Sequence, residues 1–437
     1  MNRARDVSAG SILALAVPAL GALAADPVLS LVDTAFVGRL GSIPLAALGI
    51  DSALFAFAFA VFNFLAYATT PMVAQARGRG DIAGAGTIVR RALVLAVGLG
   101  APGTAMLVGA AGPLVRLMQA APAVVDPAAS YLRIRALAVP AVLIITAGNG
   151  AYRGFKDTRT PLYVVLAVNA LNIVLDAVLI FGAGLGLEGA AYATVAAQWL
   201  GAGVFLLLLR RVAVRESWPA GRVRLRDLRS FATVGAVLIV RTLLLVLSMS
   251  VATAAAARIG TVEVAAHQVV AQVWFLLAMA IDALAIAAQA LVAELAGEGD
   301  MAGARRLAGR LFRWGVVSGA LLGLLVLAAG PGLAVLFTSE PVVRESIRSV
   351  LPVAALIQPV AAWVFVADGV FLAVLATRLL AVSTAAGLVA TIAVLAATLR
   401  LEWGLPGVWW AMTAMIAARA AVLATAYVRT SPTLSSS

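Results

Sequence analysis

The segment Met72–Ala85, MVAQARGRGDIAGA, recurs later in the chain at Leu291–Ala304 as LVAELAGEGDMAGA. Eight of the fourteen positions are identical, and a constant 219 residues, half of the 437-residue chain, separates the two copies. The same separation pairs Pro140 with Pro359. The offset slips by one residue near the ends of the halves, where Gly186 matches Gly404, as a single deletion in a loop would produce. This pattern predicts an internal duplication.

The composition indicates that most of this chain lies in lipid. Hydrophobic residues make up 63% of the sequence and charged residues 12%, whereas soluble domains have about 45–50% and about 25%. Charges gather in short clusters between apolar stretches of roughly 20 residues, the length that a helix needs to cross a bilayer. These stretches lack the alternation of barrel strands, so we expect an all-α membrane protein.

Several other classes are excluded by the residues that the chain lacks or has only once. There is no cysteine and one histidine, His267, so a thiol or zinc enzyme is not expected and no metal or cofactor is predicted. The one lysine, Lys156, is not in a phosphate-binding loop, which excludes an ATPase. We assign the net charge of +12 to membrane topology and expect no nucleic-acid partner. The apolar run that follows Arg3 and Arg5 continues to Phe36 and is too long for a cleaved leader.

Basic residues predict the orientation of the spans. If the N-terminus is cytoplasmic, 22 of the 32 basic residues lie inside, 6 lie outside and 4 lie in spans, which favours both termini in the cytoplasm. The twelve predicted spans are 11–37, 47–71, 92–118, 128–151, 160–182, 189–209, 230–257, 265–293, 311–337, 349–375, 379–399 and 405–428.

The duplication divides these spans into two sets of six. An even number of spans in each copy gives both copies the same orientation, so the repeats are parallel. We therefore predict twelve transmembrane helices in two pseudo-symmetric six-helix bundles around a central cavity. The N-terminal bundle is 1–209, the Arg-rich cytoplasmic linker is 210–229 and the C-terminal bundle is 230–437.

The offset also sorts the polar residues inside the spans, which are functional candidates because ionisable groups are costly in lipid. Asp33 corresponds to Ala252, and Asp176 to Leu395 or Val394, so these two acids occur in the first half only. Asn172 lies one turn before Asp176 on the same helix face, with Asn169 on the same stripe. An asparagine–aspartate hydrogen bond that only joins helices is the alternative interpretation.

Two further candidates lie earlier in the first span. Pro27 predicts a kink because proline removes a helical hydrogen bond, and Asp26 is a second candidate proton site beside it. By contrast, Asp282 and Asp368 match the polar residues Asn63 and Asn149 in the first half. We expect these two acids to join helices, and we expect His267 to pack in the protein interior.

A buried acid that binds either a proton or a cationic substrate performs exchange, which is the chemistry of an antiporter. Two other functions remain open on the residues alone. An intramembrane enzyme would use Asp33 and Asp176 as an aspartic pair, but the duplication predicts no such pair. A channel would normally repeat its polar pore-lining groups in both halves.

Motifs throughout the chain resemble those of the multidrug and toxic compound extrusion (MATE) family, in particular its DinF-like branch. They are Val32–Gly41 (VDTAFVGRLG), Tyr152–Thr158 (YRGFKDT), Asn172–Asp176 (NIVLD), Ala265–Gln268 (AAHQ) and Asp282–Val292 (DALAIAAQALV). One departure follows Asp368–Gly369, where Val370–Arg378 lacks the glycine and the acid that the family usually has before Thr-Arg.

This resemblance implies secondary export of organic, cationic or amphipathic compounds in exchange for protons by alternating access. It implies a coupling site of Asp33, Asn172 and Asp176, joined by Thr194 and Tyr131, in which protonation alters the bend at Pro27. It also implies a monomer in the cell membrane, whose partners are small organic substrates and membrane lipid. Sodium coupling and a lipid or polysaccharide flippase remain the alternatives, and the substrate is not specified by the sequence.

Overall fold

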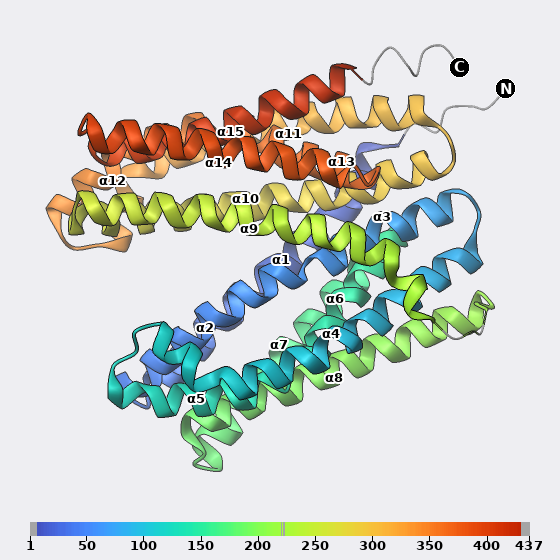
Figure 1. The fold of residues 1–437 in the computed structure, drawn as a ribbon, viewed down its shortest axis with the longest axis horizontal. Helices are drawn as coiled ribbons and strands as arrows, with labels where there is room; N and C mark the ends of the chain where they lie inside the picture. The colour runs from blue at the N-terminus through green and yellow to red at the C-terminus, as the bar shows by residue number, and fades with distance from the viewer. Residues whose placement is uncertain (1–6, 220, 222, 430–437) are drawn as a thin grey trace. The chain divides into compact units, whose positions relative to one another are not determined.

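The computed structural model describes residues 7–219, 221 and 223–429. Tertiary contacts divide the chain into two compact units, Val17–Gly235 and Ala236–Ser437 with Met1–Ala16. We refer to these units as the N-terminal lobe and the C-terminal lobe. Helices and turns account for all the regular structure in the described residues of both lobes (Figure 1).

The N-terminal lobe contains most of the first helix and the seven α-helices that follow it. A π-helical segment, η1, follows α7, and a short 3-10 turn, η2, precedes the next lobe. The elements are α1 (Ala9–Gly38), α2 (Ser42–Phe62), α3 (Phe64–Gly78), α4 (Ile82–Leu117), α5 (Pro122–Ala136), α6 (Val139–Gly154), α7 (Arg159–Asp176), η1 (Ala177–Gly182), α8 (Gly186–Arg215) and η2 (Leu225–Leu228).

The C-terminal lobe contains longer, less interrupted helices, the first of which, α9, begins in the N-terminal lobe. They are α9 (Arg229–Ile259), α10 (Thr261–Gly297), α11 (Met301–Phe337), α12 (Pro341–Leu356), α13 (Gln358–Ala373), α14 (Thr377–Arg400) and α15 (Gly404–Arg429).

The number of spans agrees with the sequence prediction once two bent pairs of helices are each counted as one span. Ten helices of the described residues are long and apolar enough to cross a membrane, and the two bent pairs bring the number to twelve. The helix pair α5–α6 bends by 49° and α12–α13 by 52°. The sequence predicted unbroken spans at 128–151 and 349–375. In each pair the second helix has a proline at its second position, Pro140 or Pro359, and proline breaks the helical hydrogen-bond ladder.

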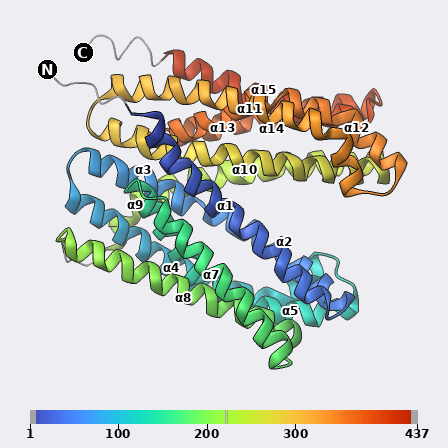
Figure 2. The ribbon, with the colours of Figure 1, turned by 180° about the vertical axis from the view of Figure 1, so that it is seen from behind.

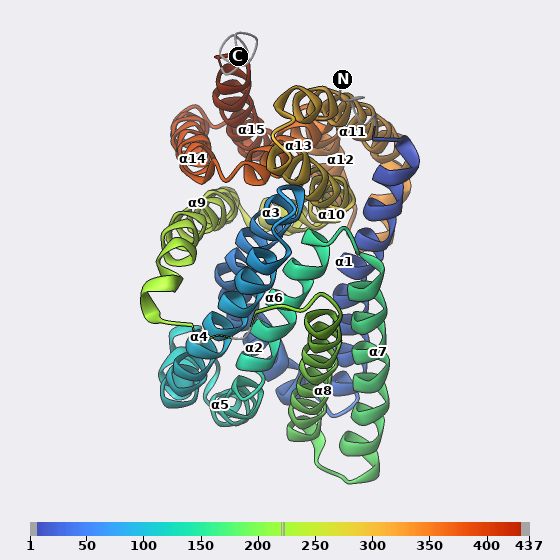
Figure 3. The ribbon, with the colours of Figure 1, turned by 90° about the vertical axis from the view of Figure 1, so that its right-hand side faces the viewer.

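The two lobes repeat the same packing. The central helix is α6 in one lobe, which contacts α3, α4 and α8, and α13 in the other, which contacts α10, α11 and α15. The view along the helices shows α6 among its neighbours (Figure 3), and the view from behind shows α7 beside α8 (Figure 2). This equivalence is the structural form of the duplication in the sequence.

The repeated motif, Met72–Ala85 and Leu291–Ala304, forms the same helical hairpin in both lobes. Asp81 accepts a hydrogen bond from the backbone N–H of Gly84 at 2.7 Å, and Asp300 accepts one from Gly303 at 2.7 Å. Each aspartate therefore caps the N-terminus of the following helix, α4 or α11. The preceding residue, Gly80 or Gly299, has a positive φ, a backbone conformation that favours glycine.

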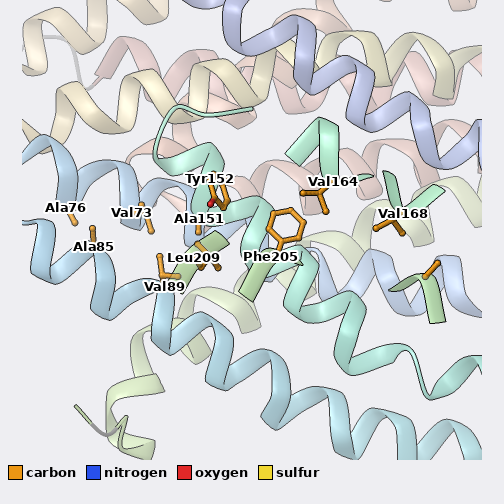
Figure 4. Packing of buried hydrophobic residues seen from close by; sticks show 11 residues of the cluster. Val73, Ala76, Ala85, Val89, Ala151, Tyr152, Val164, Val168, Phe205 and Leu209 are labelled. Atoms are coloured by element: carbon orange, nitrogen blue, oxygen red, sulfur yellow. The ribbon is translucent and has the colours of Figure 1, made fainter. Parts of the chain in front are cut away.

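Apolar packing joins five helices of the N-terminal lobe near this hairpin. Figure 4 shows side chains from α3, α4, α6, α7 and α8 in one cluster, including Val73, Val89, Tyr152, Val164 and Phe205. Burial of this kind of surface stabilises a membrane lobe through close packing rather than through exclusion of water.

An ion pair lies beside this cluster at the end of α8. Arg77 donates hydrogen bonds to both carboxyl oxygens of Glu216, at 3.0 and 3.1 Å, and the Trp218 indole N–H donates to the same carboxyl. Burial raises the pKa of Glu216, but the hydrogen bonds from Arg77 and Trp218 and the charge of Arg77 hold it below the ordinary value.

Candidate functional site

Asp33 on α1 and Asp176 at the end of α7 face each other within the N-terminal lobe, as their carboxyl groups interact directly. Asp33 is half-buried and Asp176 is 1% exposed. Within the described part of the chain, one oxygen of Asp33 and both oxygens of Asp176 are buried without a hydrogen-bond partner. Ionised carboxyls offer acceptors only, so these three oxygens have no hydrogen-bond donor among the described residues.

The local helix geometry accounts for the position of Asp176. It is the last residue of α7, and the π-helical segment Ala177–Gly182 follows directly. Short π segments within helices frequently occur at functional sites. Asn172, one turn earlier, is buried, and neither polar atom of its side chain has a partner among the described residues. The side-chain oxygens of Asp176 and Asn172 therefore have no hydrogen-bond donor among the described residues.

Two further candidates, Asn169 on α7 and Asp26 on α1, form a separate contact. Asn169 is buried and lies against Asp26 of α1, and the Asp26 side chain is exposed. Helix α1 is continuous through Pro27, where the proline ring removes the hydrogen bond to the carbonyl of Leu23. The structure therefore places a weakened point of the helix two turns before Asp33.

Tyr131 on α5 lies near enough to the acidic pair to experience its charge, whereas no interaction of Thr194 on α8 with the pair is recorded. Tyr131 is 1% exposed and experiences the charges of Asp33 and Asp176. The Thr194 hydroxyl donates a hydrogen bond to the carbonyl of Ala190 at 3.0 Å. Ala190 packs in the same apolar cluster as Tyr131, so Thr194 lies one turn away from that cluster.

Two charged residues of this region escaped the sequence prediction. Asp51 on α2 is fully buried, and Arg135 on α5 is half-buried. The charge of Arg135 acts on Asp33, Asp51 and Asp176. The offset of 219 would have revealed both, because Asp51 corresponds to Val270 and Arg135 to Ala354. They share the asymmetry that singled out Asp33 and Asp176.

In the C-terminal lobe, the buried acid Asp368 has hydrogen-bond donors beside it. One oxygen of Asp368 on α13 accepts hydrogen bonds at 2.6 Å from Arg241 of α9 and Arg419 of α15. Three helices are therefore joined through one carboxylate, as the sequence analysis expected for this residue. His267 lies buried between Thr253 and Trp409, which agrees with the packing role expected for it.

Within residues 7–219, 221 and 223–429, no three side chains of His, Asp or Glu come close enough together to hold a metal ion. What the N-terminal lobe does offer is a set of buried, unpaired oxygens near a single arginine. Such a set suits a proton or a cation that enters and leaves.

Comparison with known proteins shows which family has this arrangement of helices. The sequence model of the MatE family matches residues 18–178 and 238–397, one stretch in each half of the chain. The chain belongs to the MATE family. It is therefore a multi-pass membrane transporter of the multidrug and toxin efflux class, and not an enzyme.

Relatives of this MATE protein occur in plants and bacteria. It is 36% identical over 428 residues to Protein DETOXIFICATION 44, chloroplastic, of Arabidopsis thaliana, which covers 93% of this chain and 80% of the relative. It is 28% identical to the DNA damage-inducible protein F of Escherichia coli, over 95% of this chain and 91% of the relative. These matches confirm the DinF-like resemblance.

A solved structure described as MATE in the bent conformation has the same fold. The two chains superpose with a TM-score of 0.88 at 21% identity, over 96% of this chain and 93% of the other. The predicted fold of two six-helix repeats is thereby confirmed.

Proposed function

We propose that this MATE protein is an antiporter that exports organic, cationic or amphipathic compounds in exchange for protons by alternating access. The observation that supports it is the pair of facing carboxyls, Asp33 and Asp176, which has no hydrogen-bond donor between its oxygens. A buried carboxylate costs several kcal/mol unless a proton or an opposite charge compensates it. Proton and cationic substrate therefore compete for one pair of acids.

The surrounding residues would orient this pair. Tyr131 can donate its hydroxyl hydrogen to a carboxylate, and the unpaired Asn172 amide offers both a donor and an acceptor. A change of charge at Asp33 acts on α1, whose ladder is weakened at Pro27. Thr194 would contribute only after its hydroxyl leaves the carbonyl of Ala190. The polar side chains on α1, α5 and α7 would bind the substrate and the coupling ion in alternation.

Sodium is the second candidate ion, because the unpaired oxygens of Asn172 and Asp176 are the hard ligands that such an ion takes. The cell membrane is the proposed location, with both termini cytoplasmic and the protein working as a monomer. The substrate class comes from the acidic character of the pair rather than from a recognition motif.

The test is efflux of ethidium from liposomes that contain the purified protein, with a proton gradient and separately with a sodium gradient. We expect proton-driven efflux in the wild type and its loss in Asp33→Asn and in Asp176→Asn, both inserted and folded. Efflux that persists in both variants would show that other residues couple transport. Efflux under the sodium gradient alone would change the ion, and transfer of a fluorescent lipid without ethidium efflux would replace the antiporter with a flippase.

A further inference from the structure

Asp51 is a buried acid that takes no part in the exchange of proton for substrate proposed at Asp33 and Asp176. It is 0% exposed on α2, and neither of its carboxyl oxygens has a hydrogen-bond partner among the described residues. An acid in that condition is costly unless it is compensated. Since α2 packs against α5, the compensation is to be sought on α5.

The side chain that α5 offers to Asp51 is Arg135. The Arg135 guanidinium carbon lies 4.6 Å from the centre of the Phe55 ring. Phe55 follows Asp51 by one helical turn, and residues four apart lie on the same face of a helix. The guanidinium is therefore at the face of α2 that carries Asp51, held there by a cation–π contact.

Arg135 is shared rather than committed to one acid. It forms no direct ion pair with an acid in the part of the chain that the structure describes, although its charge acts on Asp33, Asp51 and Asp176. Its guanidinium carbon also lies 5.9 Å from the ring centre of Tyr131, and Tyr131 experiences the charges of all three acids. The groups recorded around Asp51 are thus Arg135 and Tyr131 on α5. These two residues also interact with Asp33 on α1 and Asp176 on α7 and so connect Asp51 to that pair.

The charge balance of this group follows directly. Three carboxyl groups and one guanidinium leave two negative charges uncompensated when every acid is ionised. Resting on the antiport function proposed above, we propose that Asp51 is a third proton-binding acid of the site and that Arg135 is its built-in counter-cation. The site then exchanges two protons for each substrate molecule, with Arg135 neutralising the acid that remains ionised.

The number of protons can be measured from the steady state that a pH gradient supports. With the membrane potential clamped at zero, each exchanged proton multiplies the steady-state concentration ratio of ethidium across the membrane by about ten per pH unit. We expect a ratio of about a hundredfold per pH unit for the wild type and about tenfold for Asp51→Asn. The exposed acid Asp126, on the same helix as Arg135, gives the matched control Asp126→Asn, for which the wild-type ratio is expected.

Removing the counter-cation has the opposite effect. Arg135→Gln leaves three acids without a positive charge, so we expect about a thousandfold per pH unit, and the double variant Asp51→Asn with Arg135→Gln returns to about a hundredfold. A purely structural role of either residue would change yield or rate without changing this slope.

The outcomes separate this inference from the proposed function. If the ethidium ratio of the wild type is about a hundredfold per pH unit and does not change in Asp51→Asn or Arg135→Gln, the inference is wrong and proton antiport is unaffected. A wild-type slope of about tenfold also overturns it. If Asp51→Asn is not recovered folded, Arg135→Gln and the double variant decide. No ethidium ratio in the wild type at any pH gradient overturns the proton antiport itself.

Discussion

The same residue type has opposite surroundings in the two lobes. Asp176 has no partner for its oxygens among the described residues, whereas Asp368 accepts hydrogen bonds from two arginines. A carboxylate held by two guanidiniums has no need of a proton, and one without a donor does. This difference separates an acid that joins helices from acids that are suited to exchange.

Asp368→Asn tests that distinction. The substitution removes the charge that Arg241 and Arg419 share, and breaking a buried pair costs about 3–5 kcal/mol. We expect a large loss of folded protein in a thermal-denaturation assay and near-normal turnover in the protein that does fold. Glu345→Gln, at an exposed acid of α12, is the control. Normal yield without transport would instead move Asp368 to the functional site.

The Arg77–Glu216 pair gives a prediction about pH. The pKa of Glu216 in the folded protein lies below the ordinary value of 4.5, so its contribution to stability is fully present above pH 4.5. It is lost as the pH falls through the lowered value. We expect the melting temperature of the wild type to fall more steeply below pH 4.5 than that of Glu216→Gln. The difference corresponds to roughly 1 kcal/mol or less because both side chains are partly exposed. Parallel curves would contradict it.

At the scale of the element, the π segment after Asp176 depends on a close approach of α8. A Cβ atom built on Gly189 would lie 2.8 Å from the carbonyl carbon and oxygen of Leu179 in that segment. Backbone atoms cannot move aside as a side chain can. The glycine therefore allows α8 to support the turn that positions Asp176.

Gly189→Ala is expected to displace the π segment and to destabilise the protein by about 1–3 kcal/mol. Gly203→Ala on the same helix is the control, since a Cβ there meets nothing within 4 Å. Thermal denaturation and ethidium efflux are the measurements, and we expect both to decline in Gly189→Ala only. Equal behaviour of the two variants would mean that the close approach is not required.

At the scale of the whole molecule, the absence of cysteine from the chain makes the proposed orientation directly testable. Ser217 follows α8 and Ser339 precedes α12, and both are exposed. Cysteine introduced at Ser339 is expected to react with a membrane-impermeant maleimide in intact cells, and cysteine at Ser217 only after the cells are permeabilised. The reverse pattern would place both termini outside.

Prediction from the sequence was most complete for features that repeat. The number of spans could be predicted from the length of the hydrophobic segments, because a helix must cross a fixed thickness of lipid. The offset of 219 predicted that the spans form two groups of six. Pro140 and Pro359 were visible as a pair, but the bends of 49° and 52° were not. A proline removes a hydrogen bond, and the packing of neighbouring helices decides how far the chain then bends.

The sequence by itself determined the membrane environment, the twelve spans, the duplication and the two asymmetric acids Asp33 and Asp176. These depend on composition, period and offset, which are properties of the linear chain. Only the tertiary structure decided that Asp33 meets Asp176, that Arg135 reaches the face of Asp51, and that two arginines hold Asp368. The sequence shows which side chains are charged, but the group with which each charge interacts depends on which helices pack together.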